Sequence, residues 1–154
     1  MTTNDPAAAA PAAASTDGPA ADARAADVSE AVSAGTGAIV LVISTFESRE
    51  QAEPIARALV EERLAACANL LPGCLSIYRW QGAIERADEA LMLVKTTRDR
   101  YPALERRLHE LHPYELPEIV AVAPARVLAA YADWVAGETR PTGSDLDSRP
   151  ADRS

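Results

Sequence analysis

The residues from His112 to Glu118 combine ionisable side chains with a rigid backbone. The run reads His-Pro-Tyr-Glu-Leu-Pro-Glu, so an imidazole, a phenol and two carboxylates lie close together in the chain. Pro113 and Pro117 fix φ and remove two backbone donors, and they push the residues before them toward extended conformations. A simple linker does not need this chemistry, so we interpret the run as part of a binding site or of a contact between chains.

Two cysteines supply the thiols of the chain. Cys67 and Cys74 are separated by six residues, a spacing that matches neither a zinc knuckle nor a redox-active Cys-x-x-Cys pair. The N-terminal residues lack the basic and apolar segments of a secretory signal, and no apolar stretch approaches the roughly 20 residues needed to span a bilayer. We therefore expect a cytoplasmic protein with no membrane partner, in which both thiols are reduced.

Composition divides the chain into a core and two tails. Residues 1–37 contain fourteen alanines and no aromatic residue, so they cannot bury enough apolar surface to offset the entropy of ordering them. Residues 138–154 carry prolines, a glycine and alternating charges. We predict that both tails are disordered and that residues 38–137 form a single domain of ordinary size.

The charge of the chain argues against nucleic acid as a partner. The net charge at pH 7 is −8, and residues 38–137 hold 14 acidic and 11 basic side chains. Proteins that bind nucleic acid usually present a basic face to the phosphate backbone. A weakly acidic domain lacks such a face, so we expect no nucleic-acid partner.

The first expected elements of the domain are a strand and a helix. Residues 38–44 form an apolar run rich in β-branched side chains, which predicts a strand buried on both faces. Ser48 and Gln51 match a capping box and predict a helix from residue 48 to about residue 63. Pro54 would break an interior hydrogen bond of this helix, so we expect the helix either to kink there or to begin later.

Residues 67–97 predict a long hairpin. Pro72-Gly73 interrupts the first strand, residues 67–80, and indicates a bend or bulge. Gln81-Gly82 suits a two-residue turn, and residues 83–97 supply the returning strand. Because typical strands have about 5–6 residues, the far end of this hairpin is expected to project beyond the sheet.

The remaining elements complete an α+β arrangement. Asp99 is the expected N-cap of a second helix, which Pro113 ends, residues 119–123 predict a fourth strand, and an apolar face near residues 128–135 predicts a final helix. The order βαββαβ plus a C-terminal helix is that of a ferredoxin-like sandwich. Helices on one face leave the other face of the sheet uncovered, so we expect the chain to form a homo-oligomer.

Four blocks of sequence, in this order, resemble the CutA divalent-cation-tolerance proteins. The blocks are residues 63–73, 76–82, 91–97 and 112–118, and the match extends over residues 39 to about 135. The resemblance implies a ferredoxin-like subunit in a tight homotrimer, with long hairpins that reach onto neighbouring subunits. It also implies a cytoplasmic protein with a role in tolerance of divalent metals, copper binding as in some members, and no enzymatic reaction or organic cofactor.

The resemblance places Cys67 at the position of a recurrent cysteine of the family. A thiolate is a good ligand for Cu(I), although free cysteine is also among the most buried residue types. His112 is the second candidate, either as a neutral imidazole ligand of copper or zinc or as a cation at the C-terminus of a helix. With Glu115 and Glu118 nearby, these residues form the predicted site for copper or another divalent metal.

Two departures from some copper-binding relatives bear on this predicted site. Ser44 and about Arg107 occupy positions where those relatives carry further cysteines. Without these thiols, a copper site in this chain has to rest on Cys67, on His112 and on the carboxylates near His112.

The trimers of this family resemble those of the PII signal proteins, which bind small ligands in clefts between subunits. Lys95 is the only lysine of the chain and ends an apolar run, so it requires a carboxylate or anionic partner. With Tyr78, Trp80 and Tyr114 it is predicted to line such an inter-subunit cleft. Alternatively, the aromatic residues are anchors that hold the trimer together.

Two functions therefore compete. The favoured one is a CutA-like tolerance protein that responds to metal ions and binds copper directly. The alternative is a non-catalytic trimeric scaffold or a small-ligand signalling protein of PII-like type, with an anionic effector near Lys95 and His112. The chain lacks a Gly-rich phosphate loop, which argues against a nucleotide ligand, and no nucleophile–base pairing indicates an enzyme.

Overall fold

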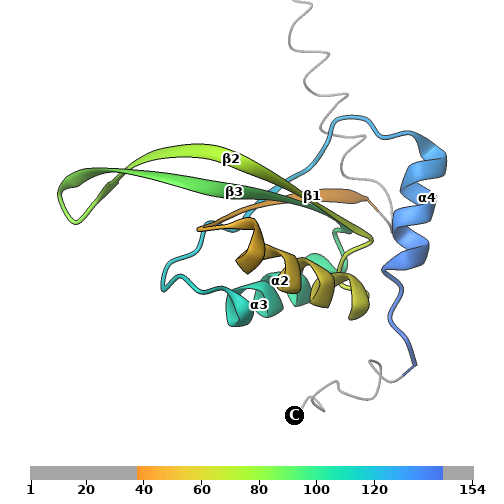
Figure 1. Cartoon of the computed structure of the whole chain (residues 1–154). Helices are drawn as coiled ribbons and strands as arrows, with labels where there is room; N and C mark the ends of the chain where they lie inside the picture. Colours follow the sequence, from red (N-terminus) through yellow and green to blue (C-terminus); the bar gives the residue numbers. More distant parts are fainter. Residues whose placement is uncertain (1–37, 144–154) are drawn as a thin grey trace, which may run out of the picture.

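The computed structural model describes residues 38–143, so both the predicted tail at residues 1–37 and residues 144–154 lie outside it. The order of elements along the described residues agrees with the prediction, and the mixed α+β class is confirmed. None of the described helices is long and apolar enough to cross a membrane. The elements (Figure 1) are β1 (Ile39–Phe46), α2 (Arg49–Glu61), β2 (Cys67–Trp80), β3 (Ala83–Thr97), α3 (Tyr101–Leu111), β4 (Val120–Val122) and α4 (Ala129–Glu138).

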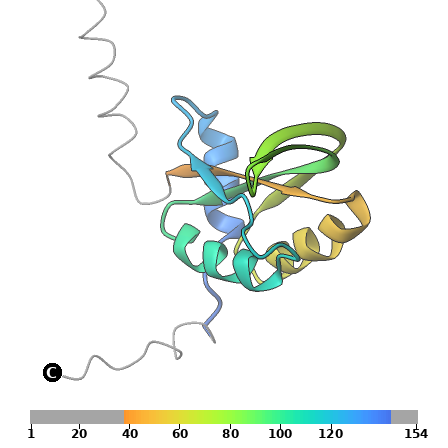
Figure 2. The ribbon, with the colours of Figure 1, turned by 90° about the vertical axis from the view of Figure 1, so that its left-hand side faces the viewer.

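The strands form one antiparallel sheet in the order β2-β3-β1-β4. β3 pairs with the whole of β1, from Ile39 opposite Thr97 to Phe46 opposite Ala90. β2 lies on the other side of β3, and β4 pairs with β1 at the opposite edge. α2 and α3 lie side by side against one face of the sheet (Figure 2), and α4 stands at the end of the sheet opposite the hairpin (Figure 1).

The core lies between the sheet and the two helices α2 and α3. Successive side chains of a strand point to opposite faces, so every second residue of β1 and of the inner half of β3 is buried. Both helices present an apolar stripe at three- and four-residue spacing, and each large side chain buried there stabilises the fold by about 1.5–3 kcal/mol. The largest fully buried apolar side chains are Phe46, Leu59, Met92, Leu104 and Leu108.

The prediction that the first strand is buried on both faces is wrong for the single chain. Val42 and Phe46 are fully buried, whereas Leu41 and Ile43 on the opposite face are half-buried. α2 and α3 cover only one face of the sheet. Among the described residues, α4 reaches the other face only near the end of the sheet opposite the hairpin. β1 therefore alternates in burial although its sequence is apolar throughout.

Helix α2 begins at the predicted capping residue. The backbone N–H of Gln51 donates to Ser48 Oγ at 3.3 Å, but the Gln51 side chain donates to Glu47 and not back to the cap. Half of the capping box is thus formed. The helix neither begins late nor ends at Pro54, because it continues through this exposed residue to Glu61.

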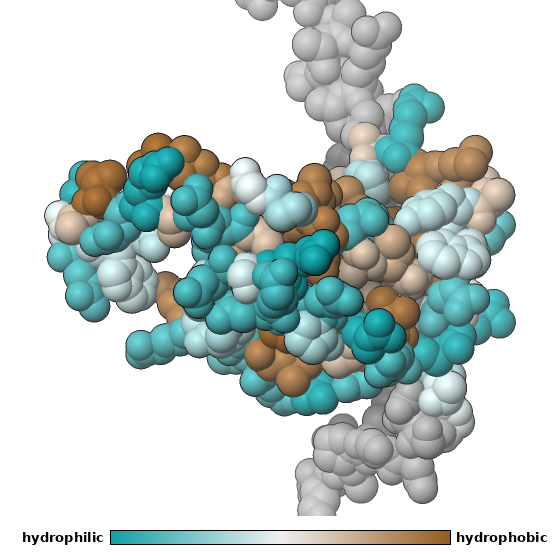
Figure 3. Space-filling view, viewed as in Figure 1, coloured by the Kyte–Doolittle hydropathy of each residue, from teal (hydrophilic) through white to brown (hydrophobic). Residues whose placement is uncertain are grey.

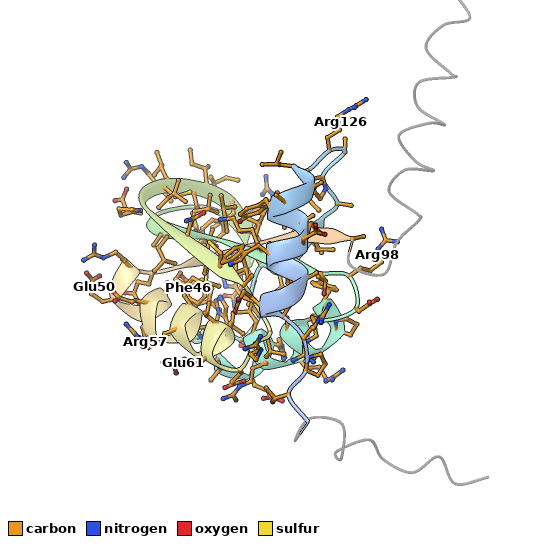
Figure 4. All side chains as sticks on the ribbon, turned by 90° about the vertical axis from the view of Figure 1, so that its right-hand side faces the viewer. Phe46, Glu50, Arg57, Glu61, Arg98 and Arg126 are labelled. Carbon is orange, nitrogen blue, oxygen red and sulfur yellow. The ribbon has the colours of Figure 1, made fainter. Side chains whose placement is uncertain are left out.

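The outer face of α2 is charged. Glu50, Arg57 and Glu61 project away from the sheet (Figure 4), and Arg57 lies 3.9 Å from Glu61 one turn later. An exposed pair of this kind contributes only about 0.3–0.5 kcal/mol. The helix is therefore held in place by its buried apolar side.

The predicted hairpin, bulge and turn are confirmed. The register between β2 and β3 shifts at Gly73, which has φ of 83° between Pro72 and Cys74. Gln81 and Gly82 both have positive φ, as a tight two-residue turn requires. The hairpin extends well beyond the end of β1 (Figure 1), and much of its apolar surface is exposed.

The start of α3 differs from the prediction. The N-cap is Arg100, without a side-chain capping bond, so the prediction of Asp99 as N-cap is wrong. Pro102 stands in the first helical turn, where its fixed φ favours initiation and its missing N–H costs nothing.

The folded structure continues past the predicted boundary at residue 137. α4 runs to Glu138, and Thr139 after it is buried. The guanidinium of Arg63 donates to the carbonyl oxygens of Gly137, at 3.0 Å, and Arg140, at 3.1 Å. Because the last carbonyls of a helix lack partners within it, Arg63 both caps α4 and fastens it to the loop after α2.

A buried hydroxyl in the core provides a stability test. Ser44 is fully buried and its Oγ has no hydrogen-bond partner, whereas the equally buried Thr96 donates its Oγ1 to the Leu64 carbonyl at 2.6 Å. We expect Ser44→Ala to raise the free energy of unfolding by about 1 kcal/mol, because it removes an unsatisfied polar group, and Thr96→Val to lower it by about 1 kcal/mol. Chemical denaturation of the two variants checks this, and a loss of stability in Ser44→Ala would contradict it.

Candidate functional site

A pocket of about 600 Å³ lies at the base of the projecting hairpin. Its lining comes from the end of β1, from both strands of the hairpin, and from the segment that follows α3, residues 112–119. Figure 3 shows the hairpin overhanging this side of the molecule. The sequence run that we interpreted as a site or a contact therefore forms one wall of a concave surface.

The buried carboxylate of Glu89 lies in this pocket. The Glu89 side chain is 9% exposed. Ser76 Oγ donates to its Oε2 at 2.5 Å, and the Tyr114 hydroxyl donates to its Oε1 at 2.9 Å. Hydrogen bonds to an ionised acceptor are stronger than those between neutral groups, so the carboxylate joins β2, β3 and the segment after α3.

Tyr114 acts as a hydrogen-bond donor in this arrangement. Burial raises the pKa of Tyr114 strongly, and the hydrogen bond to Glu89 and the negative charge of that carboxylate raise the pKa further. The phenol therefore stays protonated at neutral pH and keeps its proton between the two oxygen atoms.

His112 holds the backbone of Tyr114. Its Nδ1 accepts the Tyr114 backbone N–H at 3.1 Å, so its Nε2 carries the proton and donates to the Thr45 carbonyl at 3.1 Å. The imidazole is 8% exposed and stacks on Phe46, with ring centroids 4.4 Å apart. Both ring nitrogens are thus engaged, and the one lone pair of the neutral ring is used within the chain.

Burial lowers the pKa of His112. The hydrogen bond to Thr45 and the negative charge of Glu89 partly oppose this effect, and the nearby charge of His109 adds to it. His112 is therefore neutral at neutral pH. The alternative in which it acts as a cation at the end of a helix is wrong.

The rest of the pocket lining is aromatic, apolar and acidic. Tyr78 and Trp80 follow each other at two-residue spacing on β2 and are each 45% exposed. The lining also includes two carboxylates, those of Glu115 and Glu118, and two exposed apolar side chains, Ile77 and Leu116. No lysine, arginine or histidine is among the lining residues of this pocket, so its electrostatic character is negative.

The four predicted metal ligands do not come together in one chain. Glu115 and Glu118 line the pocket, and His112 lies behind it with both nitrogens engaged. Cys67 begins β2 at the opposite end of the sheet, where Lys95 Nζ lies 3.7 Å from its Sγ. Within residues 38–143, no three His, Cys, Asp or Glu side chains are grouped as a metal site would require.

The two positions at which some relatives carry cysteine lie apart from the pocket. Ser44 is buried in the core. Arg107 lies on the surface of α3, where its guanidinium binds the Glu62 carboxylate with contacts of 2.8–3.1 Å. Neither residue lines the pocket.

Three of the four residues predicted for an inter-subunit cleft do share this pocket. Tyr78, Trp80 and Tyr114 line it, whereas Lys95 does not and instead donates to Asn69 beside Cys67. The sequence interpretation missed Ser76 and Glu89. Their signal is positional, because counting from the turn at residues 81–82 places them diagonally across the hairpin on one face, with Glu89 just before a buried apolar run.

The neutral state of His112 predicts how stability depends on pH. When the pKa of a group is lower in the folded than in the unfolded protein, the folded state loses stability as pH falls through the pKa of the unfolded state, which for histidine is about 6.5. We expect the free energy of unfolding to fall from pH 7 to pH 5, and this fall to be smaller in His112→Gln than in wild type or in the exposed control His109→Gln. Denaturation at each pH checks this. Equal slopes in the His112 and His109 variants would contradict it.

Comparison with known proteins agrees with this architecture. The family described as "CutA1 divalent ion tolerance protein" matches residues 40–138. The divalent-cation tolerance protein CutA of Thermus thermophilus is 52% identical over 99 residues, covering 64% of this chain and 96% of that protein. Human protein CutA is 38% identical over 114 residues, covering 74% of this chain and 64% of that protein.

Solved structures give the same result. The crystal structure of CutA from Xylella fastidiosa matches with a TM-score of 0.65 and 45% identity, covering 67% of this chain and 99% of that one. The structure of the Thermus thermophilus protein matches with a TM-score of 0.64 and 50% identity, covering 66% of this chain and 99% of that one. The resemblance seen in the four sequence blocks is confirmed, and the chain belongs to the CutA1 divalent ion tolerance family.

Proposed function

We propose that the protein contributes to tolerance of divalent cations as a homotrimer of ferredoxin-like subunits and binds copper through the thiol of Cys67. Membership of the CutA1 family supports the tolerance role. The cytoplasm is the proposed compartment, since Cys67 and Cys74 are both free thiols and thiols remain reduced there. The proposal assigns no catalytic step.

The proposed assembly is supported by the large apolar side chains that the single chain leaves exposed. They gather on the hairpin, on the segment after α3, on the edge strand β4 and around α4, and monomeric proteins rarely leave large contiguous apolar patches on their surface. An interface buries such residues at its centre, with aromatic side chains prominent. The residues are Leu71, Leu75, Ile77, Tyr78, Trp80, Ile84, Leu116, Val120, Val122, Leu128, Tyr131 and Trp134.

Cys67 carries the copper proposal. Its thiol is half-buried rather than fully enclosed, and it lies beside the ammonium of Lys95. A thiolate is the softest ligand that a protein offers to Cu(I). His112 is not included, because both of its nitrogens are already bonded within the chain. Further ligands to the metal come from a second copy or from water.

Native mass spectrometry of the full chain with Cu(I) tests assembly and metal binding together. We expect the mass of a trimer, carrying about one copper ion per chain in wild type and in the control Cys74→Ser, whose thiol is also half-buried. Cys67→Ser should retain the trimer and lose the copper, because serine does not provide a soft ligand. A monomer would contradict the assembly, and equal copper loading of the two serine variants would contradict ligation by Cys67.

A second function, that of a small-ligand signalling protein of PII-like type, is favoured by a different observation. The pocket beneath the hairpin is separate from Cys67, and it joins a buried polar floor to exposed aromatic walls. Ligand sites of proteins commonly combine a mostly apolar lining with a few fixed polar groups. Its acidic lining does not suit the anionic effector expected from the sequence.

A further inference from the structure

We propose that, in the homotrimer, the hairpin of one copy packs its outer face into the pocket of the next copy, where Arg86 of that hairpin pairs with Glu115 and Glu118. This pairing rests on the proposed homotrimer and adds which surfaces of the chain meet in it. A pocket filled in this way is closed to small ligands, which disfavours the PII-like function.

The outer half of the hairpin lacks support within the single chain. β1 pairs with β3 only from Ala90 onward, so residues 74–89 form a two-stranded ribbon without a third strand (Figure 1). An isolated two-stranded hairpin is at best marginally stable in water. A second copy packed against this ribbon supplies the cover that the single chain does not.

The two faces of this ribbon carry different side chains. Successive residues of a strand point to opposite faces, and the register pairs Tyr78 with Glu85 on the pocket face and Ile77 with Arg86 on the outer face. The outer face combines exposed apolar residues with two arginines and one aspartate, and its members are Leu75, Ile77, Arg79, Ile84, Arg86 and Asp88. Ile77 also borders the pocket. The outer face is therefore apolar with a positive net charge.

The pocket offers the opposite charge. Glu89, Glu115 and Glu118 line it, and no basic side chain does. Glu89 is satisfied by two hydroxyls, but the carboxylates of Glu115 and Glu118 have no hydrogen-bond or ion-pair partner within residues 38–143. The guanidinium of Arg86 has no partner within those residues either. Complementary charges across an interface decide which surfaces meet and in which register.

Arg86 is better placed for this contact than Arg79. Arg79 donates to the carbonyl oxygen of Gly82 at 3.4 Å, beside the turn, whereas Arg86 lies further from the turn with its guanidinium unpaired in the single chain. The planar guanidinium binds carboxylates through two parallel hydrogen bonds. The exposed side chain of Ile84, two residues before Arg86 on the same face, meets the exposed aromatic walls of the pocket.

The pairing of two different faces suits a closed ring. When the contacting surfaces of identical chains differ, each copy presents both surfaces, and the contact repeats from copy to copy. A threefold rotation closes this series with every pocket filled and every outer face covered. A face that paired with itself would instead produce a dimer.

Cross-linking of the full-length protein tests this pairing directly, because Lys95 is the only lysine of the chain. In Arg86→Lys, a carbodiimide joins the new amine to any carboxylate with which it forms an ion pair. In trimers assembled from ¹⁴N- and ¹⁵N-labelled chains, we expect a mixed-label product between the peptide that contains position 86 and the peptide that contains Glu115 and Glu118. The control Arg57→Lys, on the outer face of α2, should give no such product. A trimer without this cross-link would overturn the pairing and leave the homotrimer standing, whereas a monomer would overturn both.

Reversal of the charges tests the same pairing through the lifetime of the trimer. Arg86→Glu should speed the exchange of subunits between labelled trimers about tenfold, because it places like charges opposite each other. Adding Glu115→Arg and Glu118→Arg to this variant should slow the exchange again, since the ion pair is rebuilt with reversed signs. The control is Arg57→Glu, an exposed arginine outside the hairpin. Equal exchange in Arg86→Glu and the control, or no recovery in the triple variant, would overturn the pairing.

Discussion

The buried carboxylate of Glu89 is the interaction on which the rest of this region depends. Moving a carboxylate out of water costs several kcal/mol. The fold retains it because both of its oxygens accept hydrogen bonds, from the hydroxyls of Ser76 and Tyr114. The bond from Ser76 joins the two strands of the long hairpin, and the bond from Tyr114 fastens the base of this hairpin to the segment that begins after α3. Without them the hairpin would be joined to the domain mainly through strand pairing, and the pocket would lose its floor.

His112 supports this carboxylate indirectly, by holding the backbone of Tyr114. Its imidazole uses one nitrogen to hold the Tyr114 backbone and the other to reach the Thr45 carbonyl at the end of β1, while its ring packs on Phe46 in the core. The run from His112 to Glu118 thus has two parts. Its first residues are structural and tie the segment to β1, and its two glutamates line the pocket.

The parts of the fold that could be predicted from the sequence are those that local interactions decide. The turn at Gln81-Gly82 and the cap at Ser48 follow from residues within a few positions of each other. The prediction of Asp99 as the N-cap was wrong because the helix begins after Arg100, with Pro102 in its first turn and no capping side chain. The prediction that β1 is buried on both faces was wrong because burial depends on which faces other elements cover.

The candidate site was only partly predictable, because its geometry depends on register and on distance along the sheet. Glu89 meets Ser76 because both lie between the turn at residues 81–82 and the bulge at Gly73, where the strand register places them diagonally on one face of the hairpin. Cys67 and His112 resembled a ligand pair by residue type, yet they lie at opposite ends of the sheet. Residue type indicated the right chemistry, and the strand register decided which groups meet.

His112 is a neutral support of the pocket whose two ring nitrogens are both hydrogen-bonded within the chain. Nitrogen-15 NMR of the histidine rings in the full-length protein tests this most directly, with the exposed His109 as an internal reference. At pH 7 we expect the His112 Nδ1 signal of an unprotonated nitrogen and the Nε2 signal of a protonated one, and we expect Cu(I) to leave both signals unchanged. A protonated Nδ1, or a shift of the His112 signals on adding Cu(I), would contradict it.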